Sequence, residues 1–70
     1  MNGEVTKWND AVGSGQITDD EEGDTFSFTR ADCKARAQAA LRNKAIPPDA
    51  NIAVSFDENL EGGAFNVDTR

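Results

Sequence analysis

The sequence lacks histidine and tyrosine, and it contains a single cysteine, Cys33. Histidine is the side chain most often used as a general base and as a metal ligand, so its absence argues against both roles. One cysteine forms no internal disulfide, and nothing around it has the spacing of a zinc site. We therefore expect no enzyme, no metal site and no small-molecule cofactor.

Long apolar segments are also missing. No run approaches the roughly 18 apolar residues that a membrane-spanning helix needs, so we expect no membrane partner. The opening residues have neither the basic part nor the apolar part of a secretory signal. Together with the lone cysteine, this favours the reducing cytoplasm as the location of the protein.

Large apolar side chains are few. Leucine, isoleucine, valine and phenylalanine supply 13 of the 70 residues, while alanine alone supplies ten. Thirteen acidic and seven basic residues leave a net charge of −6. This composition lies close to that of disordered chains. The length limits the protein to one domain, residues 1–70, with a thin core.

The charges are unevenly distributed along the chain. Residues 30–46 carry a local charge of +4, so the remaining residues carry −10. The densest acidic run, residues 19–24, is typical of a solvated turn between strands. A calcium-binding loop is the sharper alternative, but the run lacks the spaced ligands and the terminal glutamate of an EF-hand.

Three short strands are predicted in the first half of the chain. Residues 3–9 are rich in β-forming residues, and residues 13–18 form a second strand. The glycine pair Gly13 and Gly15 indicates a strand bend where another backbone approaches closely, since it lacks the lysine and hydroxyl of a phosphate loop. Residues 25–29 alternate between polar and apolar side chains, which is typical of a third strand with both phenylalanines on one face.

A helix is predicted next, inserted within about residues 30–45. Its alanine content gives high helix propensity, and Thr29 or Asp32 could cap its first turn. Pro47 and Pro48 stop it, because proline cannot continue a helix.

Residues at four-residue spacing form two stripes along the surface of this predicted helix. Cys33, Ala37 and Leu41 form a narrow apolar stripe. We interpret Cys33 as a semi-buried structural cysteine rather than as a thiol whose pKa the neighbouring bases lower. The second stripe is polar, mostly basic, and is either a solvated face or a binding face: Arg30, Lys34, Gln38 and Arg42.

Two more strands are predicted after the helix. Residues 51–57 alternate again, with Ile52, Val54 and Phe56 on one face, and in a last strand Phe65 and Val67 share a face. The order β-β-β-α-β-β predicts an all-β fold of OB type, a small five-stranded Greek-key barrel with a helix inserted between strands three and four. The alternative architecture is a three-stranded sheet packed on a helix.

The first half of the chain resembles the bacterial cold-shock proteins. Residues 3–9, GEVTKWN, are similar to the family opening GKVKWFN. Residues 12–17, VGSGQI, are similar to the first RNA-binding signature, KGFGFI, and residues 24–29, DTFSFT, to the second, DVFVHF. The spacing between these two segments matches that of the family without a gap.

The second half resembles the same family over shorter stretches. Residues 53–56, AVSF, match the fourth strand of the family, and residues 64–67, AFNV, are similar to its closing AANV. In all, the resemblance covers residues 1–29 and 49–68. It implies an OB barrel that binds single-stranded RNA or DNA by stacking bases on aromatic side chains.

The departures from the family pattern fall on that stacking surface. Lys7 stands in place of the family tryptophan, and Trp8 stands in place of the following phenylalanine. Ser14, Gln16 and Thr29 replace three further phenylalanines, and the basic helix replaces a loop. Because each stacked base contributes roughly 1–3 kcal/mol, we expect binding to be weak. The resemblance leaves three stacking platforms: Trp8, Phe26 and Phe28.

The orientation of these rings stays open. Alternation alone turns Phe26 and Phe28 inward, whereas the resemblance and its unbroken spacing favour the outward orientation, and a slip of one residue exchanges the two faces. Trp8 is either a stacking platform or part of the core, where its indole N–H needs a partner. Lys7 is either an ordinary strand lysine or a phosphate contact.

Taken together, these features predict a divergent cold-shock-like protein, a monomer, that binds single-stranded DNA or RNA weakly or with altered preference and acts in gene expression. Bases of the helix would supply phosphate contacts that the strands have lost. The alternative is a protein-interaction module on the same fold, in which the eroded surface meets a protein partner. The candidate nucleic-acid-binding residues are Lys7, Trp8, Phe26, Phe28, Arg30, Lys34 and Arg42.

Overall fold

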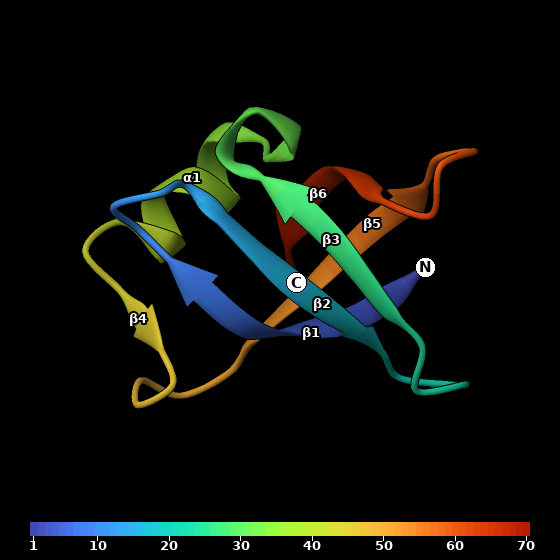
Figure 1. Ribbon diagram of the computed structural model, residues 1–70, viewed down its shortest axis with the longest axis horizontal. Helices are drawn as coiled ribbons and strands as arrows, with labels where there is room; N and C mark the ends of the chain where they lie inside the picture. Colours follow the sequence, from blue (N-terminus) through green and yellow to red (C-terminus); the bar gives the residue numbers. More distant parts are fainter.

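Strands dominate the computed structural model, which describes all 70 residues (Figure 1). Five strands lie within about one residue of where the sequence predicts them, and a sixth, of two residues, was not expected. In chain order the elements are β1 (Asn2–Asn9), β2 (Ser14–Asp19), β3 (Thr25–Thr29), the 3-10 turn η1 (Arg30–Asp32), α1 (Ala35–Leu41), β4 (Ala45–Ile46), β5 (Ile52–Glu58) and β6 (Ala64–Thr69).

The strands form one sheet in the order β3-β2-β1-β5-β6, and the short β4 pairs with β1. All neighbours along this order are antiparallel. The sheet curls into a half-barrel, so that its edge strands β3 and β6 approach each other, with a parallel bridge between Ser27 and Gly63 (Figure 1). Because all the long strands belong to one sheet, the alternative architecture, a three-stranded sheet packed on a helix, is wrong.

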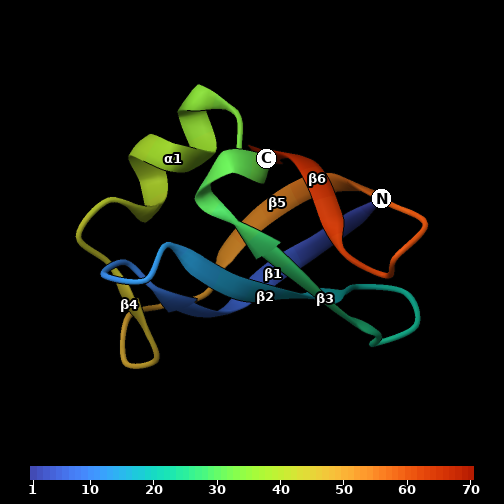
Figure 2. The ribbon, with the colours of Figure 1, turned by 45° about the horizontal axis from the view of Figure 1, so that its top comes forward.

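The helical insertion is shorter than predicted. Asp32 accepts hydrogen bonds from the backbone N–H and the hydroxyl of Thr29, at 2.8 and 3.1 Å, which closes the turn η1. The chain then becomes extended, because the N–H of Lys34 donates to the carbonyl of Val67 on β6 at 2.7 Å. Only Ala35–Leu41 is α-helical, and this helix packs against β6 at one end of the sheet (Figure 2). No helix has the length and apolar character that crossing a lipid bilayer requires.

The core is a cluster of 13 buried apolar residues inside the curled sheet and under α1. The predicted apolar stripe is part of it, since Cys33, Ala37 and Leu41 are all buried. Val54 and Phe56 are buried with Ile52 packed against them, as the alternation of residues 51–57 predicts. The other members are Val5, Trp8, Ile17, Phe26, Phe28, Ile46, Ala64 and Val67.

A β-bulge in β1 decides which side chains of that strand point inward. Val5 and Lys7 pair with consecutive residues of β2, so Thr6 between them is an extra residue. An extra residue shifts the alternation by one position. Val5 and Trp8 are therefore both buried, while Lys7 is exposed.

A second bulge lies in β6. Asn66 and Val67 together face the single residue Phe56 of β5, and Asn66 has a positive φ of 51°. The shifted alternation leaves Val67 fully buried and Phe65 38 % exposed. The prediction that Phe65 and Val67 share one face is therefore wrong, because strict alternation does not allow for a bulge.

Candidate nucleic-acid interface

A groove of about 600 Å³ crosses β1, β2 and β3 near the end of the sheet that carries β4. Its polar lining comes from side chains that alternate with core residues along the strands. Asp32 also lines the groove, but its carboxylate accepts the two hydrogen bonds from Thr29. The polar strand residues of the lining are Lys7, Asn9, Ser14, Gln16, Ser27 and Thr29.

Strand pairing arranges these polar side chains in two rows across the sheet. In one row Lys7 pairs with Gln16, and Gln16 pairs with Ser27. Lys7 is the one charged side chain of the two rows, and the hydroxyl and amide groups around it both donate and accept hydrogen bonds. The second row consists of Asn9, Ser14 and Thr29.

The sequence interpretation treated Ser14, Gln16 and Thr29 only as lost stacking platforms, and it gave Ser27 no role. Their alternation with buried residues was the signal that could have found this polar surface.

Trp8 belongs to the core and is no stacking platform. It is 4 % exposed, and its ring stacks on that of Phe28 with centroids 5.4 Å apart and planes inclined by 17°. Its indole N–H donates to the carbonyl of Leu41 at 3.1 Å, which satisfies the partner that a buried indole requires. The bulge at Thr6 turns this ring inward and fixes β1 to the end of α1.

Phe26 and Phe28 also point into the core, at 7 % and 2 % exposed, so the outward orientation favoured by the resemblance is wrong. Phe26 packs on Phe56 with centroids 5.3 Å apart. The physical reason is the supply of large apolar side chains: with so few in the chain, the curled sheet buries these two rings and leaves the hydroxyls of β3 to water. The predicted set of exposed rings is therefore absent from the groove surface.

Gly15 lets β2 approach the tryptophan closely. A Cβ at this position would lie 2.9 Å from Cε3 of Trp8 and would collide with the carbonyl of Lys7. The interpretation of the glycine pair as a place of close backbone approach is confirmed for Gly15, whereas Gly13 lies in the turn before β2 and has the side chain of Arg30 as its nearest neighbour. Gly15 thus allows the indole to lie under β2 and form the floor of the groove.

Arg30 lies at the end of β3 and is held by Asp10. Its guanidinium donates to the carbonyl of Asp10 at 2.6 Å and to the carboxylate at 3.0 Å. It also lies 5.7 Å from the centre of the Trp8 ring. Partial desolvation raises the pKa of Asp10, but the hydrogen bonds from Arg30, Asn43 and Trp8 together lower it below its usual value. Arg30 therefore has a structural role that leaves only part of its guanidinium free for a ligand.

Lys34 and Arg42 flank α1 at its two ends. Arg42 lines a small hollow with Asp10, Arg30 and Gln38. This hollow adjoins the groove, because Asp10 and Arg30 follow Asn9 and Thr29 in the chain.

Lys34 lines neither the small hollow nor the groove, and its charge acts on Asp68 of β6. The structure thus places Arg30 and Arg42 in the small hollow beside the groove and leaves Lys34 outside both, because the chain is extended at Cys33 and Lys34 between η1 and α1.

Cys33 is a structural residue. Desolvation and the charge of Asp32 raise the pKa of its thiol to about 11, and the attraction of Arg30 does not offset them. Burial therefore outweighs the neighbouring bases, as expected for a cysteine that packs against β6.

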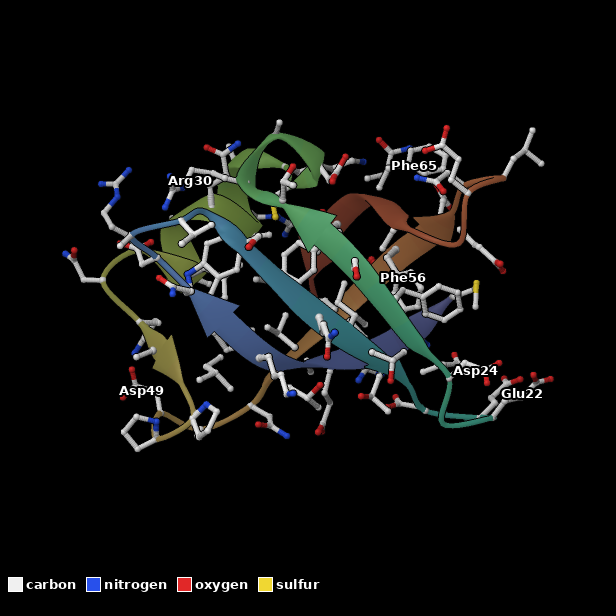
Figure 3. All side chains as sticks on the ribbon, viewed as in Figure 1. Glu22, Asp24, Arg30, Asp49, Phe56 and Phe65 are labelled. Carbon is white, nitrogen blue, oxygen red and sulfur yellow. The ribbon has the colours of Figure 1, made fainter.

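The acidic run forms the loop between β2 and β3, at the end of the molecule opposite Arg30 (Figure 3). Asp19 is buried, and its carboxylate accepts the backbone N–H of Glu22 at 2.9 Å. No histidine, cysteine, aspartate or glutamate residues cluster in a way that could hold a metal ion. The densest acidic run of the chain thus lies away from the groove.

The groove, its lysine and the adjoining arginines make up a surface suited to an extended polar or anionic ligand. Comparison of the chain with protein-family models, with curated proteins and with solved structures gives no match.

Proposed function

We propose that the protein is a divergent cold-shock-like OB barrel, closed between β3 and β6. The strand order β3-β2-β1-β5-β6 and the parallel bridge between Ser27 and Gly63 support this topology, since they connect the five strands in the sense of a Greek-key barrel. The position of α1 between β3 and β5 supports the inserted helix.

On this fold the protein binds single-stranded DNA or RNA through the groove and acts in gene expression. The observation that carries the proposal is the double row of hydrogen-bonding side chains around Lys7, on the face of strands two and three with which OB folds bind oligonucleotides. Arg42 extends this surface with a positive charge beside the groove.

Binding relies on hydrogen bonds and phosphate contacts rather than on stacking, because Trp8, Phe26 and Phe28 are buried. The lost platforms remove roughly 1–3 kcal/mol per base, so dissociation constants on the order of micromolar or weaker are expected. Two or three phosphate contacts give a salt dependence with a slope of about −2 in log affinity against log salt.

The test is a titration of the isotope-labelled protein with a ten-nucleotide thymidine or uridine strand at low salt, followed by amide shifts. We expect shifts along β1, β2 and β3 at the groove. Lys7→Gln and Arg42→Gln should each weaken binding about threefold or more, while Lys34→Gln, with the same charge change outside both the groove and the adjoining hollow, should alter it less than twofold.

If no amide shifts appear at millimolar concentrations of the strand, the proposal is contradicted and the protein-interaction alternative is favoured. Equal losses for Lys34→Gln and Lys7→Gln would show non-specific attraction to the whole molecule rather than binding in the groove.

A further inference from the structure

The hairpin between β5 and β6 exposes two large apolar side chains next to each other. Leu60 at its tip is fully exposed, and Phe65 is 38 % exposed. Together with Glu58, Asn59 and Glu61 they line one surface hollow. Isolated exposed apolar residues are ordinary, but here a leucine and a phenylalanine line one hollow in a chain with few large apolar residues, which makes the hollow a candidate contact surface.

Hydrogen bonds hold this hairpin in the conformation that exposes Leu60. The side-chain oxygen of Asn59 accepts from the N–H groups of Glu61 and Gly63, both at 2.9 Å. The N–H of Asn59 donates to the carbonyl of Gly63 at 2.9 Å. A partner therefore meets an ordered loop, so docking there costs little conformational entropy.

The bulge in β6 exposes Phe65 in the same way. Asn66 takes the extra position, and its side-chain amide donates to the carboxylate of Asp57 at 3.1 Å. In a strand of unbroken alternation Phe65 and Val67 would share one face, and the bulge separates them. The exposure of Phe65 is thus built into β6 (Figure 3).

The charged side chains beside this apolar pair are acidic, and the nearest positive charge is the N-terminal ammonium of Met1, which donates to the carbonyl of Phe56 at 2.8 Å. Residues 52–69 contain no lysine or arginine, and Glu58 and Glu61 form no ion pair. Glu58 also shares a second hollow with acidic residues of the β2–β3 loop: Asp19, Glu21, Glu22 and Asp24. A nucleic-acid strand would be repelled here, whereas a cationic partner would be attracted.

We propose that the tip of the β5–β6 hairpin docks a cationic amphipathic segment of another protein. Leu60 and Phe65 contact its large apolar side chains, while Glu58 and Glu61 pair with its lysines or arginines. The surface is small, so the interaction is transient and weak. In the ribbon this hairpin and β4, which borders the groove, extend to opposite sides, so that a single strand and a protein can bind at once (Figure 1).

The test uses a synthetic amphipathic 14-residue peptide of leucine and lysine as the probe, titrated into the isotope-labelled full chain. We expect amide shifts confined to residues 57–66 and weaker binding at higher salt. Leu60→Ser should lower the affinity about tenfold and Glu61→Gln about threefold. The matched control Val12→Ser, at another exposed apolar residue (71 % exposed), should change the affinity less than twofold.

Three outcomes overturn the proposal: equal binding of a leucine–glutamate peptide, shifts spread over the whole chain, or an unchanged affinity of Leu60→Ser. Sedimentation velocity at the titration concentrations tests the other occupant, a second copy that offers its basic helix; a dimer lost in Leu60→Ser would assign the surface to self-association instead. Lys7→Gln separates the two surfaces, because it should weaken strand binding and leave peptide binding unchanged.

Discussion

The two β-bulges of this protein have opposite consequences. In β1 the extra residue Thr6 turns the indole of Trp8 into the core and leaves Lys7 on the groove surface. In β6 the extra residue Asn66 turns Phe65 out of the core and leaves it on the hairpin surface. One end of the molecule thus presents a polar surface with its rings hidden, and the other presents a ring and a leucine among acids.

The difference shows that the number of aromatic residues in the strands does not indicate how this sheet binds a ligand. Trp8 and Phe28 stack on each other inside the core. They therefore contribute to the stability of the fold and offer no surface on which a base could stack. Phe65 contributes little to the core and is available for contact. The following experiments test this contrast, beginning with the largest expected effect.

Removal of the buried indole should have the largest effect. Trp8→Ala should cost about 3–5 kcal/mol of unfolding free energy, because it leaves a cavity beside Phe28 and removes a hydrogen bond. This is comparable to the whole stability of a small domain, so the variant is expected to be largely unfolded.

Trp8→Phe keeps most of the volume and should cost about 1–3 kcal/mol, since the carbonyl of Leu41 loses its donor. Urea denaturation followed by circular dichroism measures both losses. A folded Trp8→Ala variant of native stability would place the indole outside the core, contrary to the structure.

Gly15→Ala should have the next largest effect. The added Cβ would lie 2.9 Å from the Trp8 ring and against the carbonyl of Lys7, so β1 and β2 must move apart. Overpacking of this kind costs about 1–3 kcal/mol. The neighbouring change Ser14→Ala is the control and should stay within about 0.5 kcal/mol. Equal stabilities of the two variants in urea would argue against the close approach.

The ion pair between Asp10 and Arg30 should make the stability of the fold depend on pH. The folded-state pKa of Asp10 is below its ordinary value of 3.8, so near this pH the unfolded chain binds more protons than the folded one. The stabilisation from Asp10 is therefore present above pH 3.8 and is lost as the pH falls through the folded-state pKa. Asp10→Asn should lower the melting temperature at pH 7 and much less at pH 3; a constant difference would exclude this contribution.

The smallest change in stability is expected at the exposed ring. Phe65→Ser should cost only about 1 kcal/mol of unfolding free energy, because the ring is partly exposed and lies outside the core cluster. The same change at a buried ring, Phe28→Ser, is the matched comparison and should cost several kcal/mol. Similar losses for the two variants in thermal unfolding would contradict the contrast between the two ends.

Much of the fold could be predicted from local patterns. The alternation of residues 51–57 and the stripe of Cys33, Ala37 and Leu41 identify core positions, because burial recurs at the period of the element. The glycines and acidic residues between strands mark the turns. The resemblance placed the first three strands correctly, but it placed Phe26 and Phe28 on the wrong face.

The candidate site could be predicted only in part. The sequence by itself determined the positions of the long strands and the supply of polar side chains on β1 to β3, since both depend on residues close together in the chain. Tertiary structure alone decided the bulges at Thr6 and Asn66, and it delayed the start of the predicted helix to Ala35 by pairing Lys34 with Val67. Strand register and such pairings join residues that are far apart in sequence, and a shift of one residue there exchanges the inner and outer faces of a strand.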